Sequence, residues 1–142
     1  MYFKEINTRI GLEGLPQSAT CQTALFTGYK LYNTMECHIP GLPNKRLISI
    51  IYRTNLLQRL ENRGLEIDFI NAYHENYFKR RFNNLSLTTH LVLNLSKSHF
   101  YFLEDIKSGN AIFADITNEH LRKEGYNIDL SAKAQCKMQN EN

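Results

Sequence analysis

The sequence predicts an α+β fold in which a buried N-terminal helix, carrying a cysteine, packs on a C-terminal antiparallel sheet. Apolar residues recur at helical spacing through the first half of the 142-residue chain. From Leu87 onward, short runs of apolar, aromatic and β-branched residues alternate with turn residues, which is typical of strands. The length fits one domain over residues 1–130, and the polar tail at residues 131–142 is expected to be flexible.

Composition excludes several classes of protein. Hydrophobic residues make up 42% and charged residues 22%, as in globular chains, and the net charge of +3 is too small to indicate nucleic acid or a membrane surface. No run approaches the roughly 20 apolar residues of a membrane helix, and charges interrupt the region where a signal peptide is apolar. We therefore expect a cytoplasmic protein without a membrane span, with its three cysteines reduced and no cofactor.

Two helices are predicted in the first half of the chain. Residues 20–32 carry apolar side chains on one helical face, with Ser18 or Thr20 as the N-cap. Residues 45–64 carry two adjacent lines of apolar residues, and Gly64 stands where a helix C-terminus requires left-handed backbone.

Two weaker patterns follow. Residues 64–73 alternate in part between apolar and polar, which favours a strand. Residues 77–85 suggest a short helix with Phe78, Phe82 and Leu85 facing inward.

Three strands are predicted in the last third of the chain, at residues 87–95, 99–106 and 110–117. The letters KSGN join the last two and predict a hairpin turn with positive φ at Gly109. This hairpin would place the two strands side by side.

Three residues have the properties of a thiol-based catalytic site. Cys21 occupies the start of the first predicted helix, where free N–H groups and the helix dipole favour a thiolate. His99 begins one strand of the predicted hairpin and Asp115 lies near the end of the other, so both would meet at one end of the sheet. This arrangement indicates a nucleophile, a base and a group that orients the base.

Other interpretations of the same residues stay open. A lone cysteine on an apolar helix face is more often a small core residue, and His99 or Asp115 could simply end a strand or cap a turn. His90 and Asp105 repeat the base and acid pattern at a similar separation, but His90 is interpreted as a solvent-facing residue of a half-exposed strand.

The order Cys21, His99, Asp115, together with the segments LPQSATCQTAL and HFYFLEDIKSGNAIFADIT, resembles a known family. It is similar to the papain-like peptidase domains that process double-glycine leader peptides on bacteriocin-exporting ABC transporters, and more broadly to the transglutaminase-like superfamily. The resemblance implies a papain-like fold with Cys21 as nucleophile, His99 as general base and Asp115 as the orienting acid. It implies Gln17 as the oxyanion-hole donor, with Gln22 as its rival.

The function expected on these grounds is a cysteine-dependent hydrolase or acyl or amide transferase acting on a peptide or protein. An alternative is a non-catalytic peptide- or protein-binding module on the same scaffold. A third possibility is a small-molecule acyltransferase.

Two further classes of site are not favoured. Cys37 and His38 are adjacent and no CxxC pair occurs, so we expect no metal site. The basic run at residues 79–81, flanked by aromatic residues, is interpreted as the face of an amphipathic helix, so we expect no nucleic-acid partner.

Overall fold

The computed structural model divides into two compact units, each built from two separated stretches of chain. The residues it describes are Lys4, 6–113 and 119–128. The first unit comprises Met1–Ile67 and Arg80–Ser98, and the second comprises Asp68–Lys79 and His99–Asn142.

The two units interleave along the chain, so the division is not a boundary between consecutive domains. The single domain over residues 1–130 therefore stays a prediction. The tail at residues 131–142 lies outside the described residues.

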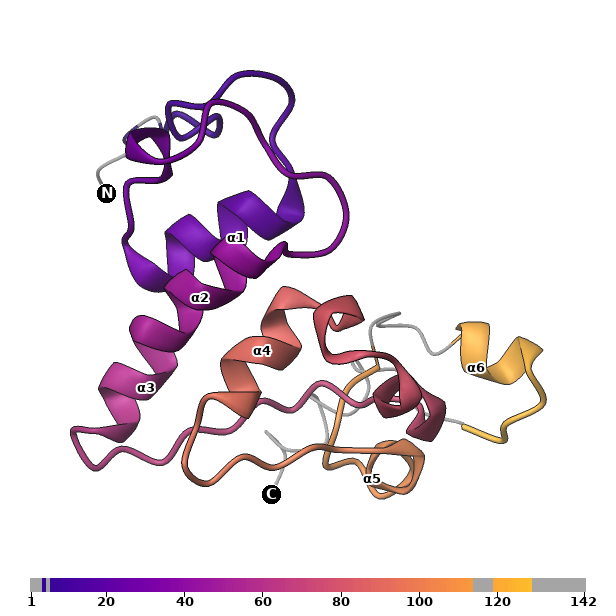
Figure 1. Cartoon of the computed structure of the whole chain (residues 1–142). Helices are drawn as coiled ribbons and strands as arrows, with labels where there is room; N and C mark the ends of the chain where they lie inside the picture. The colour runs from indigo at the N-terminus through magenta and orange to yellow at the C-terminus, as the bar shows by residue number, and fades with distance from the viewer. Residues whose placement is uncertain (1–3, 5, 114–118, 129–142) are drawn as a thin grey trace. The chain divides into compact units, whose positions relative to one another are not determined.

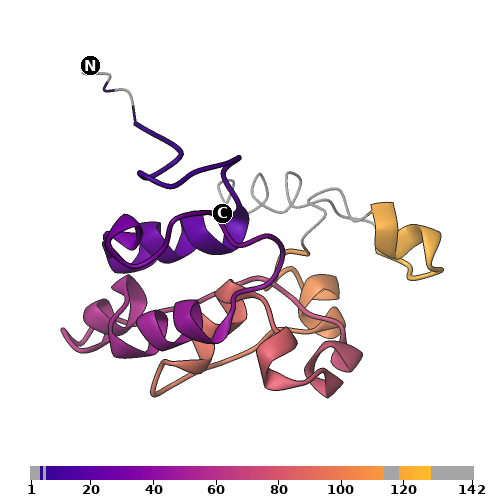
Figure 2. The ribbon, with the colours of Figure 1, turned by 45° about the horizontal axis from the view of Figure 1, so that its top comes forward.

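The first unit is a helical assembly in which α2 packs against both α1 and α4. Figures 1 and 2 show α1 and α2 side by side. Its elements are α1 (Ser18–Thr27), η1 (Leu31–Asn33), α2 (Lys45–Arg53), α3 (Leu56–Glu61), η3 (Phe82–Asn84) and α4 (Leu87–Leu93).

Two apolar clusters form the core of this unit, and α2 contributes to both. Leu47 and Ile50 of α2 pack with residues on one side of the helix, and Ile51 packs on the other. The first cluster is Leu12, Ala19, Leu31, Leu47 and Ile50, and the second is Ile51, Leu87 and Leu91, with Phe26, Tyr52 and Leu57 against it.

The predicted helix over residues 20–32 is confirmed in its first part as α1 and ends early. Gly28 has φ 69°, and its N–H donates to the Ala24 carbonyl at 2.8 Å, which is an αL helix end. The N-cap is Gln17, whose side chain makes no capping hydrogen bond, and not Ser18 or Thr20. Left-handed backbone at this position costs little free energy, because glycine has no Cβ.

The helix predicted over residues 45–64 is two helices, α2 and α3, divided at Thr54 and Asn55. Asn55 is fully buried, and its side chain serves both helix ends: Nδ2 donates to the Ile51 carbonyl at 3.1 Å, and Oδ1 accepts the Gln58 N–H at 3.0 Å. A side chain that satisfies an end of each helix stabilises the break. The predicted left-handed backbone at Gly64 is confirmed. The Gly64 N–H donates to the Glu61 carbonyl and the Leu65 N–H donates to the Leu60 carbonyl, which together form a Schellman motif.

The strand predicted at residues 87–95 is wrong, because this segment forms α4. Ser86 caps the helix by accepting the Thr89 N–H at 3.3 Å. Leu87 and Leu91, four residues apart, are buried on the same face against Ile51. Apolar residues in this segment recur at helical spacing as well as at the alternating spacing of a strand. The Ser86 cap and the packing against α2 stabilise the helix over the strand.

In its described residues, the second unit contains three short helical elements and a small apolar core. The helices are η2 (Glu75–Lys79), α5 (Leu103–Lys107) and α6 (Glu119–Lys123). Its buried core residues are Ala72, Ile106, Ala111, Leu121 and Ile128.

The strand predicted at residues 99–106 is also wrong, because its second half is α5. The Asp105 carboxylate accepts the Phe102 N–H at 2.8 Å and so caps the helix start. The positive φ expected at Gly109 is confirmed, at 79°. The predicted hairpin is wrong, because this turn ends α5 and does not join two strands. Gly109 and Asn110 donate to the Ile106 and Asp105 carbonyls in a second Schellman motif.

The α+β fold with an antiparallel sheet is contradicted: within the described ranges the chain is helix-rich and contains no β-strand. Extended segments there meet only at isolated parallel bridges, namely Glu13 with Cys37, Asn71 with Ile112, and Ala72 with Tyr101. Part of the third predicted strand, residues 114–117, lies outside the described residues.

The single helix expected at residues 77–85 is replaced by parts of two 3-10 helices, η2 and η3, which belong to different units. Of its expected inward residues, Leu85 is buried, whereas Phe82 is 50% exposed.

Candidate functional site

Cys21, the predicted nucleophile, lies in the first turn of α1. It is half-buried, and its Sγ lies 3.7 Å from the Thr8 carbonyl oxygen, which the thiol can donate to. Its backbone N–H donates to the Gln17 carbonyl at 2.9 Å, as an ordinary intrahelical bond. That N–H is therefore not free to bind an oxyanion.

The two glutamines considered for an oxyanion hole flank Cys21 in the first unit. Gln17 is half-buried, and its Nε2 lies 3.5 Å from the Leu15 carbonyl oxygen, at the limit of a hydrogen bond. Gln22, inside α1, is also half-buried. Gln17 is the N-cap residue of α1, whereas Gln22 lies within the helix, and the choice between them as oxyanion-hole donor stays a prediction.

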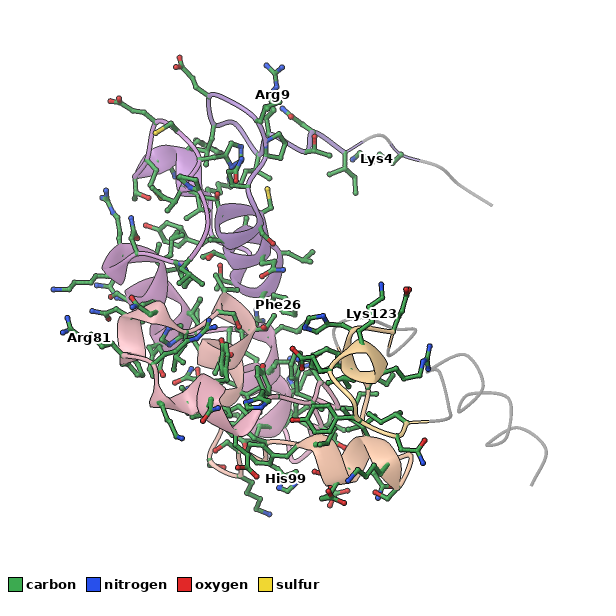
Figure 3. All side chains as sticks on the ribbon, turned by 90° about the vertical axis from the view of Figure 1, so that its right-hand side faces the viewer. Lys4, Arg9, Phe26, Arg81, His99 and Lys123 are labelled. Carbon is green, nitrogen blue, oxygen red and sulfur yellow. The ribbon has the colours of Figure 1, made fainter. Side chains whose placement is uncertain are left out.

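The predicted base and orienting acid do not share the unit of Cys21. His99 belongs to the second unit, is exposed, and contacts the Tyr101 ring edge to face with 4.5 Å between ring centroids. Figure 3 shows its side chain at the margin of the ribbon. Asp115 lies outside the described residues. The triad of Cys21, His99 and Asp115 therefore stays a prediction.

The alternative pair, His90 and Asp105, is also divided between the units. Asp105 caps α5. His90 is fully buried in α4, so its interpretation as a solvent-facing strand residue is wrong. Burial lowers the pKa of His90, and the nearby Phe82 carbonyl partly offsets this.

A buried polar pair fixes the loop that follows η1 against the start of α1. His38 Nδ1 lies 3.0 Å from the Thr20 hydroxyl oxygen, and both side chains are buried. The Thr20 hydroxyl oxygen also lies 3.3 Å from the Gln17 carbonyl oxygen, to which the hydroxyl can donate. The loop is thereby held by a side chain that points into the core.

The same loop is held from a second side by the parallel bridge between Glu13 and Cys37. Glu13 N–H donates to the Glu36 carbonyl at 2.9 Å, and the Glu13 carbonyl accepts the His38 N–H at 3.4 Å. In this pattern the backbone groups of Cys37 point away from Glu13. No described residue provides them with a hydrogen-bond partner, so Cys37 presents a free extended edge.

An open hollow of about 660 Å³ lies beside this edge. Its walls combine apolar side chains with the charges of Glu36 and Arg46. Within the described part of the chain, neither of those charges has an ion-pair partner. The lining residues are Tyr32, Asn33, Thr34, Met35, Glu36, Cys37, Ile39, Asn44 and Arg46.

Sequence reasoning considered Cys37 and His38 only as metal ligands and so missed this site. The stretch is extended at Cys37, where it forms the bridge to Glu13, a partner distant in the chain that no local pattern indicates. Extended chain of this kind sends neighbouring side chains to opposite sides. Cys37 is exposed, whereas His38 is buried.

Three other features considered in the sequence are a metal site, a membrane span and the basic run at residues 79–81. Among the described residues, no three His, Cys, Asp or Glu side chains gather closely enough to hold a metal ion. In the same part of the chain, no helix has the length and apolar character needed to cross a membrane. The basic run at residues 79–81 is exposed, and Figure 3 labels Arg81 within it.

No family model, curated protein or solved structure matches the chain.

Proposed function

We propose that the first unit is a binding module for an extended peptide, which pairs with the free edge at Cys37 and places its side chains in the adjacent hollow. The observation that carries the proposal is the unpaired backbone N–H and carbonyl of Cys37 on a segment already fixed by Glu13. An unpaired extended edge accepts an additional strand through main-chain hydrogen bonds.

The hollow supports this proposal by its size and its lining. A volume of about 660 Å³ falls within the roughly 300–1,000 Å³ of ligand sites in proteins. Tyr32, Met35 and Ile39 offer apolar contact, whereas Glu36 and Arg46 can attract opposite charges on the peptide. Main-chain pairing would supply affinity and these side chains would supply selectivity.

The two restraints on the loop support the proposal energetically. The contact between Thr20 and His38 and the bridge to Glu13 hold the edge before any ligand arrives. An edge that is already ordered loses less conformational entropy on binding than a free loop would.

The test uses a random peptide library displayed on phage, selected against the whole chain, with the selected peptides then synthesised for affinity measurements. Cys37→Pro removes the free edge N–H, while the two hydrogen bonds of Glu13 involve the neighbours Glu36 and His38 and persist. We expect Cys37→Pro to weaken binding by up to about 10-fold, as for loss of one hydrogen bond.

Cys37→Ala is the matched control, because it removes the thiol and keeps the backbone N–H. It should bind as the wild type does. Equal affinities for the proline and alanine variants, both folded by circular dichroism, would refute pairing at this edge.

The second candidate function is thiol chemistry at Cys21, and the observation that favours it is the position of this half-buried cysteine in the first turn of α1. Cys21 would attack an acyl carbon of a peptide, protein or small molecule. His99 would take the thiol proton and give it to the leaving group, with Asp115 orienting the imidazole and Gln17 or Gln22 donating to the oxyanion. Water or an amine would then release the acyl group.

Iodoacetamide labelling tests this second function. Cys21 should react faster than Cys37 at neutral pH although Cys37 is more exposed, and the excess should vanish in His99→Ala. Labelling that follows exposure alone in both proteins would exclude the triad. Cys21→Ala separates the two functions: it should abolish substrate processing and leave peptide affinity at the Cys37 edge unchanged.

A further inference from the structure

His90 is a titratable side chain enclosed by rings in the core of the first unit. It is 0% exposed, and neither ring nitrogen makes a hydrogen bond of normal geometry, although the Phe82 carbonyl lies close enough to offset part of the effect of burial on its pKa. Its ring meets Phe82 of η3 and Tyr52 of α2 edge to face, at centroid distances of 4.7 Å and 6.1 Å. Tyr52 and Phe82 also contact each other at 6.1 Å.

The elements around His90 contain no carboxylate that could pair with its protonated ring. The sequences of α1, α2, η3 and α4 include no Asp or Glu. The titratable groups there are Cys21 and Tyr52, and burial raises the pKa of Tyr52, so its phenol stays neutral. The cations are Lys45, Arg46 and Arg53 on α2 and Arg81 beside η3.

The remaining neighbour, α3, carries Arg59 and one carboxylate, Glu61. That carboxylate accepts the N–H groups of Ser96 and Lys97 at 3.0 to 3.2 Å, and these bonds lower its pKa. The Glu61 carboxylate is therefore already hydrogen-bonded to the segment that follows α4. A positive charge on His90 would therefore be buried without a counterion, which is costly.

We propose that the contact of α4 and η3 with α2 is an acid-sensitive latch, which opens when His90 leaves the core and takes up a proton. Opening would expose the apolar face that Leu87 and Leu91 share with Ile51. The latch is distinct from the proposed peptide site, whose residues lie between Tyr32 and Arg46.

The direction of the pH effect follows from linkage. His90 has a lower pKa in the closed form than the ordinary value near 6.5, so the open form binds more protons at acid pH. The stability of the closed form is fully present above about pH 6.5 and declines as the pH falls below it. One such proton raises the opening constant by at most about 30-fold between pH 7.5 and pH 5.

Hydrogen exchange of the whole chain, corrected for intrinsic rates, tests the proposal at pH 7.5 and pH 5. We expect the opening constants of α4 and η3 amides to rise about 10-fold to 30-fold in the wild type. In His90→Phe, which keeps a ring without a titrating group, the rise should vanish. His90→Gln provides a second neutral variant in case phenylalanine does not fit.

His74→Gln, which removes an exposed histidine of the second unit, is the control and should keep the wild-type response. A wild type whose α4 amides show no pH dependence would overturn the proposal. So would a folded neutral variant that keeps the full acid response.

Discussion

The first unit buries large aliphatic side chains on α2 and α4, which have 9 and 7 residues, whereas the α-helices described in the second unit have 5. A helix of two turns or more presents a continuous apolar stripe to a neighbour, and a single turn cannot. The core of the second unit accordingly includes the small residues Ala72 and Ala111. Aromatic rings pack against one another in this unit, as Phe78 does with Phe100 at 4.8 Å.

The helix ends also differ between the units. In the first unit, Asn44, Asn55 and Ser86 each accept a backbone N–H at a helix start. In the second unit α5 is capped by Asp105, and α5 and α6 both end in Schellman motifs, at Gly109 and Gly125. Local caps close helices in both units, since Gly64 ends α3 in the same motif, and the first unit adds close packing of α2 against α1 and α4. Four sets of substitutions test this difference.

The largest effect is expected from Leu91→Ala, in the fully buried cluster of the first unit. We expect it to lower the free energy of unfolding by about 2–5 kcal/mol, and Leu121→Ala in α6 to fall at the lower end of that range. The single turn of α6 can relax into the space, whereas Leu91 lies among packed helices. Urea denaturation measures both, and a larger loss for Leu121→Ala would reverse the comparison.

Asn55→Ala should rank next, since it removes two helix-end hydrogen bonds from a fully buried position. The expected loss is about 2–3 kcal/mol, from one cap and one unsatisfied carbonyl. Asn44→Ala is the matched control, because Asn44 is exposed and caps only α2. It should cost about 1 kcal/mol. Equal losses would mean that the second bond of Asn55 contributes nothing.

Gly109→Ala and Gly64→Ala compare the same helix end in the two units. Each glycine has positive φ, 79° and 81°, and an added Cβ would meet no atom within 4 Å. Only backbone strain is added, so both variants should lose about 1–2 kcal/mol, and Gly109→Val at least as much. Thermal melts followed by circular dichroism measure this, and a negligible loss at Gly109 would refute the local argument for the second unit.

The smallest effect on stability is expected from Asp68→Asn. The Tyr101 hydroxyl donates to the Asp68 carboxylate at 2.7 Å, and this bond is the main reason that the pKa of Tyr101 is raised above 10.0. The stabilising bond is therefore present below the ordinary tyrosine pKa and is lost as the pH rises through the raised value. In Asp68→Asn the titration should move back toward about 10. The difference in ultraviolet titration between each protein and its Tyr101→Phe form isolates this one phenol.

The candidate sites show how far sequence reasoning reached. Cys21 was correctly placed in the first turn of a helix, but the predicted apolar face of that helix is not the buried one: Ala19, Thr20 and Thr23 are buried, whereas Leu25 is 76% exposed. The peptide edge at Cys37 was not found, because it depends on Glu13, which is distant in the chain. Nothing local distinguishes a bridged extended loop from a free one.

Local chemistry in the sequence by itself determined the helix ends, because the glycines at 28, 64 and 109 adopt positive φ. The predicted helices exist in part: α1 ends before residue 32, and the helix predicted over residues 45–64 is divided into α2 and α3. Tertiary structure decided between helix and strand at residues 87–106, where both periods were present. Ser86 and Asp105 could cap helices, but the burial of Leu91 against Ile51 and of Ile106 against its own cluster made those helices stable. Helices this short gain most of their stability from packing, which a local sequence pattern cannot specify.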